Sequence, residues 1–359
     1  MTKLYTDSKI LHFHSKLKDL SDKVLSAPIH VRLKPTNKCN HKCYYCCYRN
    51  ENLYLSQLVN ENDEIPHDKM KEIVSDLVRM KVKAVTFSGG GEPLCYPYII
   101  ETMEDLLNQG VKIAVLTNGS LLKGRVAKIL SQRATWVRIS MDAADSKMYA
   151  EIRGVNLKEF DKVCENISNF VKTQNRNSKL GINFIVTKEN CKDVYKFLKL
   201  MKGLGVDHVK ISESVVSTKK EKNKEYHLPF LNLVKKQIIK GFSDLADSNF
   251  KIIDKFDDFA DNNNYYEKKY TWCPFIQCLT VIGADMNIYS CQDKAYTQKG
   301  KIGSIRNKSL WELWFSDKAK KKIAGLNPAK DCIHHCTQHT KNLMLLDYLD
   351  INQSHLEFV

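Results

Sequence analysis

The chain has 359 residues, of which 43% are apolar, and this length and composition predict a folded protein with one large domain and a smaller one. No segment approaches the roughly 20 uninterrupted apolar residues of a membrane span, and Met1–Asp22 is charged throughout, so we expect a cytoplasmic protein. Because cytoplasmic thiols are kept reduced, we expect its 12 cysteines to serve metal or redox chemistry rather than disulfides. The formal net charge of +15 fits several anionic partners, but the lysines are spread along the chain without interleaved aromatic residues, and we do not expect nucleic acid to be one of them.

Short apolar runs alternate with helical patterns along most of the chain. After a helix predicted over Ser8–Leu25, strand-like runs bounded by turn residues occur at Ile29–Leu33, Ala84–Phe87, Lys112–Leu116, Trp136–Ser140, Gly181–Val186 and Val209–Ser212. Helical patterns lie between them, at His67–Met80, Tyr98–Asn108, Leu121–Gln132, Leu157–Gln174 and Asp193–Leu204. The alternation predicts an α/β fold with a parallel sheet whose functional residues lie at the carboxyl ends of the strands, and six such units are too few for a full eight-stranded barrel.

The second half of the chain predicts a linker and a small domain. The charged stretch 217–225 is interpreted as a surface loop, a helical pattern follows at His227–Leu245, and an Asn- and Tyr-rich linker at 261–270 marks the domain boundary. Beyond it, two apolar runs, Leu279–Ile282 and Asn287–Tyr289, predict a hairpin. Helices are expected at Ser309–Ala324 and around Leu343–Leu349. The chain therefore divides into an N-terminal helix (1–28), an α/β barrel (29–226), a helical linker (227–270) and a C-terminal domain with its final helix (271–359).

Three cysteines stand close together just after the first strand-like run. Cys39, Cys43 and Cys46 have C-x₃-C-x₂-C spacing, and Tyr45 precedes the third. One short loop thus supplies three thiolates, which can bind three irons of a [4Fe–4S] cluster and leave the fourth iron open to an outside molecule. Zinc is the alternative, but structural zinc sites usually join two ligand pairs that are about a dozen or more residues apart.

A glycine-rich segment follows the second strand-like run, in the sequence Ser88-Gly89-Gly90-Gly91-Glu92-Pro93. Consecutive glycines let the backbone approach a ligand where any side chain would clash. An ordinary turn between a strand and a helix is the alternative, and the position of this segment one unit after the three cysteines favours a ligand site.

Together, the cysteine spacing and the Gly-Gly-Glu-Pro motif resemble the radical S-adenosylmethionine (SAM) superfamily. The resemblance implies a partial (β/α)6 barrel in which SAM chelates the open iron of the [4Fe–4S] cluster. It further implies that an electron donor such as flavodoxin or ferredoxin drives reductive cleavage of SAM to a 5′-deoxyadenosyl radical, which takes a hydrogen atom from a substrate carbon.

Residues at the strand ends resemble the SAM contacts of the family. The set comprises Tyr45, Gly90, Gly91, Glu92, Asn118, Ser140, Arg153 and Asn183. Within it, the Gly-Gly-Glu-Pro residues resemble the motif that contacts the SAM amino group, and Ser140 resembles a serine near the SAM carboxylate. Arg153 resembles an arginine that could clamp a carboxylate, although a surface ion pair is the alternative. Asn183 and Glu213 are expected to point into the barrel mouth, with a structural polar role as the alternative.

Five of the 12 cysteines fall in the last quarter of the chain, namely Cys273, Cys278, Cys291, Cys332 and Cys336. Four thiolates that converge from a hairpin and a following loop would fully ligate a second cluster. The arrangement resembles the auxiliary-cluster extension called the twitch domain, a shortened relative of the SPASM domain, with all but Cys278 as ligands. Cys278 could replace Cys273, and a zinc site is the alternative for the whole group. The hairpin of the family usually has a glycine where this chain has Met286, so the conformation of this turn could differ from that of the family.

The substrate is the least defined prediction. One auxiliary cluster and the basic charge favour a small anionic molecule, such as a sugar, an amino sugar or a nucleotide sugar, which the enzyme would oxidise, epimerise or rearrange. The alternative is a peptide-modifying maturase, although no peptide-recognition module is expected before Ile29. A non-catalytic iron–sulfur or zinc protein that binds nucleic acid is a third hypothesis. Cys95, at the barrel mouth, and Cys278 are candidate thiols that could return a hydrogen atom to a carbon radical.

Overall fold

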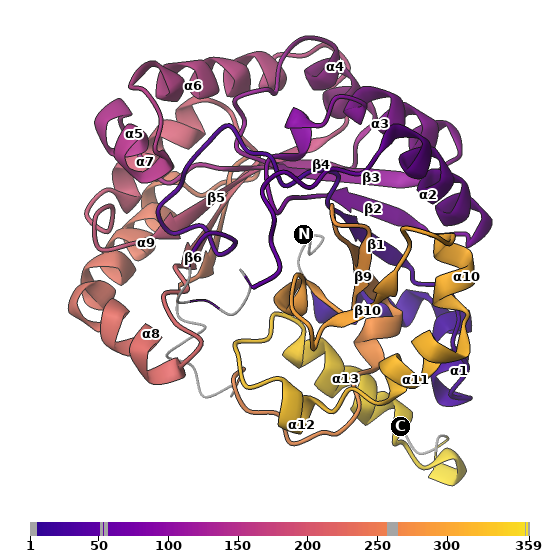
Figure 1. Ribbon diagram of the computed structural model, residues 1–359. Coiled ribbons are helices and arrows are strands. Elements are labelled where there is room, and N and C mark those ends of the chain that lie inside the picture. The colour runs from indigo at the N-terminus through magenta and orange to yellow at the C-terminus, as the bar shows by residue number, and fades with distance from the viewer. Residues whose placement is uncertain (1–5, 51–52, 54–56, 257–264, 356, 358–359) are drawn as a thin grey trace.

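The computed structural model describes residues 6–50, 53, 57–256, 265–355 and 357, and it is an open α/β barrel closed on one side by the C-terminal region (Figure 1). The barrel wall consists of parallel strands β1 (His30–Leu33), β2 (Ala84–Phe87), β3 (Lys112–Thr117), β4 (Trp136–Ser140), β5 (Lys179–Val186), β6 (His208–Glu213) and β7 (Lys251–Lys255). The predicted α/β partial barrel with a C-terminal hairpin is confirmed.

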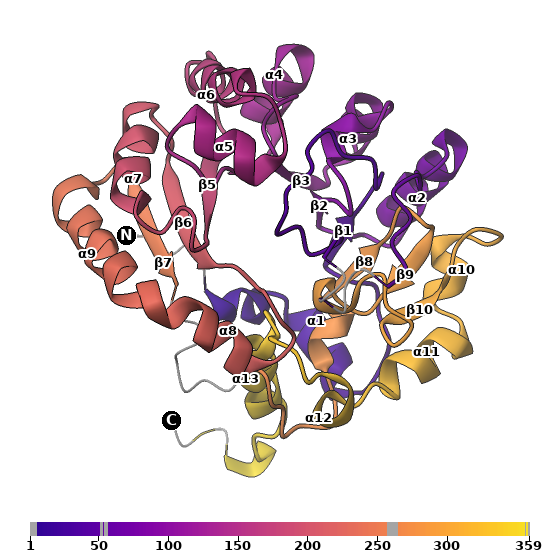
Figure 2. The same ribbon diagram turned by 60° about the vertical axis from the view of Figure 1, so that its left-hand side comes forward.

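Helices cover the outer side of this wall (Figure 2). They are α2 (His67–Arg79), α3 (Ile99–Asn108), α4 (Gly124–Arg133), α5 (Ser146–Arg153), α6 (Lys158–Val171), α7 (Val194–Gly203), α8 (Lys220–His227) and α9 (Leu231–Leu245). Alternate strand residues face these helices, because successive side chains of a strand point to opposite faces. Val85 and Phe87 of β2 are fully buried and pack in one core with Ile73 and Leu77 of α2.

Two segments differ from their sequence-based predictions. Helix α8 forms within the expected surface loop, because the buried side chain of Asn223 accepts hydrogen bonds from the N–H groups of Val216 and Ser217 and holds the turn against the helix. Strand β7 lies in the expected helical linker, where it pairs with β6 and covers an otherwise open sheet edge. The alternation of apolar and polar residues in β7 is too short to be recognised in the sequence. Part of the same linker, residues 257–264, lies outside the described residues.

The C-terminal hairpin continues the barrel sheet and does not form a sheet of its own. It consists of β8 (Leu279–Ile282) and β9 (Asn287–Tyr289), followed by β10 (Lys301–Ser304), and the order within the described residues is β10-β9-β8-β1-β2-β3-β4-β5-β6-β7. Met286 in the hairpin turn has φ = +59°, the left-handed conformation that favours glycine. The methionine therefore occupies the turn conformation that glycine would provide.

Helices at both ends of the chain pack beside this hairpin. They are α1 (His14–Ser21), preceded by a 3₁₀ helix (Asp7–His12), and α10 (Leu310–Trp314), α11 (Asp317–Ala324), α12 (Pro328–Asp331) and α13 (His339–Leu349). The single helix expected over Ser309–Ala324 is two helices, because Ser316 caps the start of α11. Ile10, Leu17 and Leu345 share a small apolar cluster, so the N-terminal helix packs on the C-terminal region.

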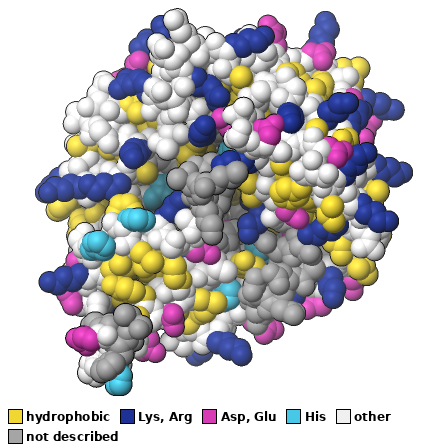
Figure 3. All heavy atoms as spheres, turned by 180° about the vertical axis from the view of Figure 1, so that it is seen from behind, with side chains coloured by type: hydrophobic (Ala, Val, Ile, Leu, Met, Phe, Trp, Pro, Cys, Tyr) yellow, Lys and Arg dark blue, Asp and Glu magenta, His cyan; other side chains and the backbone are white. Residues whose placement is uncertain are grey.

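The described helices and the visible surface bear on possible partners. In the described part of the chain, no helix is long and apolar enough to cross a membrane. On the face shown in Figure 3, Lys and Arg side chains are scattered and interspersed with acidic ones. This distribution agrees with the expectation that the positive charge is spread over the molecule.

Candidate active site and second cysteine pocket

The cysteine loop (residues 39–46) follows β1 and is fastened to the glycine-rich segment that follows β2. The N–H of Gly91 donates to the carbonyl of Thr36 (3.3 Å), and the N–H of Glu92 donates to the carbonyl of Lys38 (2.9 Å). A Cβ atom at Gly91 would lie 2.2 Å from the carbonyl oxygen of Lys38. Glycine is therefore required here because the two motifs approach each other backbone to backbone.

The three thiols of the cysteine loop are partly buried. Burial raises the pKa of Cys39 to about 12 and raises the pKa of Cys46, although the N–H of His41 donates to the sulfur of Cys39 (3.5 Å). The thiols of Cys39 and Cys46 are thus neutral in the protein alone, and metal binding would release their protons. Three thiols on one loop fit a [4Fe–4S] cluster that keeps one iron open.

Glu92 of the glycine-rich motif is buried and engaged by the protein itself. Its carboxylate accepts hydrogen bonds from the N–H of Leu94 (3.1 Å), the hydroxyl of Thr117 (2.7 Å) and the N–H of Asn118 (2.7 Å). Burial raises its pKa to about 7, and these donors oppose the rise. Glu92 therefore ties the segment after β2 to the end of β3, and the main chain of Gly90 and Gly91 remains for a cofactor.

A polar network joins the cysteine loop to the end of β3. The amide of Asn118 donates to the side-chain oxygen of Asn40 (2.8 Å), and Asn40 donates in turn to the hydroxyl of Ser120 (2.5 Å). The sulfur of Cys95 lies 3.8 Å from the same oxygen of Asn40, so Cys95 borders the cysteine loop. Sequence reasoning missed Asn40, because a polar residue between two cysteines gives no separate signal.

Arg153 is buried in an ion pair and is neither a surface residue nor a free clamp. Its guanidinium and the hydroxyl of Tyr45 both donate to one carboxylate oxygen of Asp142, and it also donates to the sulfur of Cys43 (3.5 Å). The other oxygen of Asp142 accepts from the N–H of Ile185 (2.7 Å). Burial lowers the pKa of Arg153, but the charge of Asp142 together with those of Tyr45, Cys43 and Tyr149 outweighs it, and the pKa lies well above its usual value. The predicted carboxylate clamp is thus occupied by Asp142, which sequence reasoning did not identify as central.

Ser140, at the end of β4, is the register partner of Asn183, which lies within β5, and both are half-buried. Within the described residues, the hydroxyl of Ser140 has no hydrogen-bond partner, and Asn183 accepts a long bond from Ser212 (3.5 Å). Both therefore offer polar groups to a ligand at the mouth. Glu213 is buried at the end of β6, where its charge adds to the effect of burial in raising the pKa of Tyr266.

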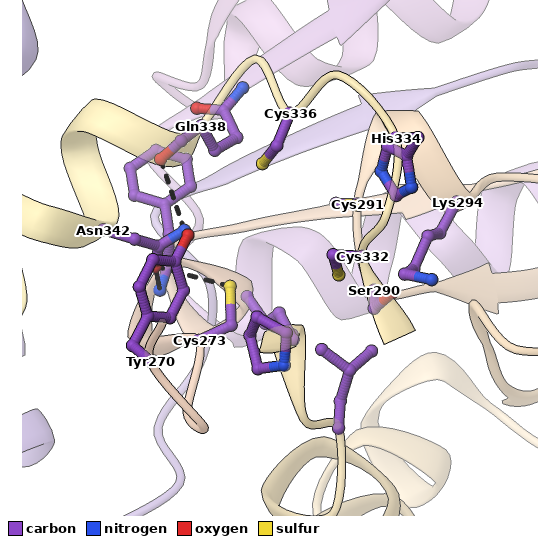
Figure 4. Close-up of a pocket in the computed structure, with 14 residues that line it drawn as sticks. Tyr270, Cys273, Ser290, Cys291, Lys294, Cys332, His334, Cys336, Gln338 and Asn342 are labelled. Atoms are coloured by element: carbon purple, nitrogen blue, oxygen red, sulfur yellow. Dashed lines mark hydrogen bonds between the residues drawn. The ribbon is translucent and has the colours of Figure 1, made fainter. Parts of the chain in front are cut away.

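A second cysteine pocket lies in the C-terminal region, and the structure brings four predicted ligands together there (Figure 4). The four are Cys273 before β8, Cys291 after β9, and Cys332 and Cys336 between α12 and α13. Burial raises the pKa of each thiol, and the neighbouring thiols add to the rise at Cys291. Four convergent thiols fit a [4Fe–4S] cluster, in which each thiolate binds its own iron.

Polar contacts from outside the pocket position these cysteines. The side-chain oxygen of Asn342 on α13 accepts from the N–H of Phe275 (3.1 Å) and from the thiol of Cys273 (3.3 Å). The ammonium of Lys268 donates to the carbonyls of Tyr265 and His334 (2.5 and 2.6 Å), which joins the chain before β8 to the loop of the last two cysteines. Such outer contacts orient metal ligands and tune the metal. Neither Asn342 nor Lys268 carries a recognisable sequence signal.

Cys278 does not lie in this pocket. It is 2% exposed and packs in the apolar cluster with Ile10 and Leu17, beneath α1 and α13. The structure therefore places Cys273, and not Cys278, among the pocket thiols, and it does not bring Cys278 to the barrel mouth as a hydrogen donor. Among the residues that the structure describes, no three or more His, Cys, Asp or Glu side chains are grouped closely enough to hold a single metal ion.

Comparison with known proteins identifies the family. A model of the Radical SAM superfamily matches residues 33–201, which include the cysteine loop, the glycine-rich motif and strands β2 to β5. The chain belongs to the radical SAM superfamily. The predictions of this superfamily and of its SAM-binding [4Fe–4S] cluster are thereby confirmed.

Curated relatives of this radical SAM protein are distant. A probable GTP 3′,8-cyclase from Sulfolobus acidocaldarius is 27% identical over 51% of the chain, and the chain spans 55% of that relative's length. A tungsten-containing aldehyde ferredoxin oxidoreductase cofactor-modifying protein from Pyrococcus furiosus is 23% identical over 80% of the chain and 81% of its own length.

Solved structures share the fold over nearly the whole chain. SuiB from Streptococcus suis, bound to its precursor peptide SuiA, is 20% identical and matches 89% of this chain and 72% of its own, with a TM-score of 0.62. The enzyme anSMEcpe with bound AdoMet is 16% identical and matches 91% of this chain and 97% of its own, with a TM-score of 0.58. Both matches extend beyond the barrel into the C-terminal region.

Proposed function

We propose that this radical SAM protein oxidises a residue of a peptide substrate, with the second cysteine pocket taking part in the reaction. The proposal rests mainly on the extent of the structural match. SuiB bound to a precursor peptide and anSMEcpe bound to AdoMet and a peptide match 89% and 90% of this chain. This support favours the peptide alternative over the small anionic molecule that composition alone suggested.

The residues of the barrel mouth have distinct roles in this proposal. The cluster and SAM, when bound, supply a 5′-deoxyadenosyl radical that takes a hydrogen atom from a substrate carbon. Ser140 and Asn183 hold SAM with the main chain of Gly90 and Gly91, whereas Glu92 and Asn118 act indirectly by fixing the loops. Arg153 orients Cys43 and stays paired with Asp142, so the SAM carboxylate is held by other groups.

The second pocket would hold an auxiliary [4Fe–4S] cluster through Cys273, Cys291, Cys332 and Cys336. After loss of a hydrogen atom, a two-electron oxidation requires the substrate to lose one further electron and one proton. An auxiliary cluster held by these four thiols would supply the acceptor for that electron, a ferredoxin or flavodoxin would take the electron from it, and water would take the proton. The hairpin that carries the pocket pairs directly with β1, which leads into the cysteine loop, so both sites are built on one sheet.

The second candidate is a small anionic substrate. Its support is the probable GTP 3′,8-cyclase among the relatives. A peptide substrate would be changed when it is co-expressed with the enzyme, whereas a small anionic molecule would leave all candidate peptides unchanged.

Iron and sulfide analysis after anaerobic reconstitution tests the cofactor assignment. We expect about eight irons in the wild-type protein and about four in the variant Cys39→Ala/Cys43→Ala/Cys46→Ala. With dithionite and SAM, the wild type should form 5′-deoxyadenosine and the triple variant should not. A wild type that forms none would contradict radical chemistry.

Mass spectrometry of a peptide encoded beside the gene tests the substrate class. We expect a product lighter by two hydrogen atoms on co-expression with the wild type, and an unchanged peptide with the triple variant. An active enzyme that leaves every neighbouring peptide unchanged would overturn the peptide assignment and favour the small anionic substrate.

A further inference from the structure

Two arginines point into the barrel from the middle of its wall. Arg32 lies on β1 and Arg138 on β4, and both are half-buried. Their strand neighbours are fully buried in the core beneath the outer helices, namely Val31, Leu33, Val137 and Ile139. Because successive strand residues face opposite sides, the two arginines face the interior of the barrel.

Neither arginine has a partner within the described chain. Neither Arg32 nor Arg138 forms a hydrogen bond or an ion pair there, and the Nε atom of Arg32 is buried without an acceptor. Arg138 lies over the ring of Trp136, with 5.7 Å between its guanidinium carbon and the ring centroid. In contrast, the charge of the buried Arg153 is balanced by its ion pair with Asp142. A buried, unpaired charge is unfavourable, so these two positions are poorly explained by stability alone.

The charges of Arg32 and Arg138 act on each other, and the loop of the second pocket also affects Arg32. Burial, and next the charge of Arg138, lowers the pKa of Arg32, while Asp293 and Cys291 act in the opposite direction. Asp293 is the acidic residue that contributes most to the pKa of Arg32, but its carboxylate already accepts hydrogen bonds from the N–H and the hydroxyl of Thr337 (both 2.9 Å). Arg32 therefore faces the barrel interior and lies near enough to Arg138 for the two charges to act on each other.

We propose that Arg32 and Arg138 form an anion subsite inside the barrel that holds a carboxylate of the substrate. Guanidinium groups bind carboxylates and phosphates through paired N–H donors, and in a half-buried site such bonds are strong. The subsite rests on the proposed function for its substrate class, which makes the anion an acidic side chain or the terminal carboxylate of a peptide. The anion neutralises the two like charges and fixes the substrate between the SAM site and the second cysteine pocket.

Calorimetric titration of the reconstituted holoenzyme tests this subsite without turnover. The probes are glutarate, for a carboxylate, and inorganic phosphate, for a phosphorylated substrate, both at low salt. We expect glutarate to bind the wild type at least tenfold more tightly than it binds Arg32→Gln or Arg138→Gln. The matched control is Arg133→Gln, which removes the same charge outside the barrel, where Arg133 donates to Asn108, and should bind as the wild type does.

The outcomes are distinct from those that test the proposed function. The carboxylate assignment would be overturned if the wild type bound phosphate more tightly than glutarate. The subsite itself would be overturned if the double variant Arg32→Gln/Arg138→Gln bound both probes as tightly as the wild type does. Neither result depends on SAM cleavage or on a peptide product.

A stability measurement separates a binding role from a structural one. Because the charges are unpaired without substrate, Arg138→Met should raise the unfolding midpoint of the substrate-free holoenzyme. A lower midpoint would mean that Arg138 supports the fold, and would contradict the proposal.

Discussion

The buried contact between Asp142 and Arg153 offers a direct test of how the cysteine loop is held. The side chain of Asp142 is 0% exposed and accepts from Arg153, Tyr45 and the N–H of Ile185. Asp142→Asn removes the negative charge and leaves the buried guanidinium of Arg153 without a counter-charge. Removing one partner of such a pair destabilises a protein by about 3–5 kcal/mol.

This free energy converts to a temperature through the size of the cooperative unit. The described strands form one continuous sheet, so we treat the 359 residues as unfolding together. The entropy of unfolding of about 2.1 cal/mol/K per residue then gives about 0.75 kcal/mol/K for the chain, and the midpoint should fall by about 4–7 °C.

Calorimetric unfolding of the cluster-free protein under anaerobic conditions measures this shift. The control is Glu104→Gln, which breaks the exposed pair of Glu104 with Arg125 and should cost at most about 1 kcal/mol. The double variant Asp142→Asn/Arg153→Met removes both buried charges and should recover at least half of the loss. A shift at Asp142→Asn no larger than the control, or a double variant whose loss is the full sum of the single losses, would refute the reasoning.

Three further predictions concern the loops, the second pocket and acid stability. Gly91→Ala should reduce iron at the SAM site after reconstitution, because its Cβ would strike the main chain of Asn37 and Lys38, which lead into the cysteine loop, whereas Gly203→Ala, which meets nothing within 4 Å, should retain it. Cys273→Ser should lower the iron content by at most about half, whereas Cys278→Ser should leave it unchanged. If Cys278→Ser lowered the iron content and Cys273→Ser did not, Cys278 would be the ligand in place of Cys273. Burial lowers the pKa of His208 to about 4, below its unfolded value of 6.5, so this residue contributes stability above pH 6.5 that is lost as the pH falls toward 4. The loss from His208 amounts to about 3 kcal/mol. His208→Phe removes the one proton that His208 takes up on unfolding, so the unfolding midpoint of this variant should depend less on pH between pH 7 and 4. A pH dependence equal to that of the wild type would contradict this prediction.

The fold and the cysteine motifs were predictable because they depend on local sequence. Strands β1 to β6 follow apolar runs bounded by turn residues, and the six units appear in the predicted order. Strand β7 and helix α8 were missed, because each is short and is stabilised by a more distant part of the chain: β7 by the edge of β6, and α8 by the hydrogen bond that Asn223 donates to the hydroxyl of Tyr266.

The contacts that position the site could not be read from the sequence. Asp142 carries no separate signal in the sequence, and its importance comes from Arg153, Tyr45 and Ile185, which reach it from three other segments. Likewise, Asn342 follows the cysteine motif as an ordinary polar residue of a helix, and only the fold brings it to Cys273. Ligand spacing is local, whereas ligand orientation is a property of the assembled barrel.

The pairing of β8 with β1 determines how the two cysteine sites are related. His30 to Leu33 are matched residue by residue with Leu279 to Ile282, and the N–H of Lys34 donates to the carbonyl of Ile282 (2.9 Å). The same strand β1 thus leads into the cysteine loop on one side and supports the hairpin of the second pocket on the other. Because a hydrogen-bonded strand pair resists sliding, the distance between the two sites is fixed by the sheet and does not depend on the linker before it. The anion subsite, with Arg32 on this same strand, is therefore held in register with both.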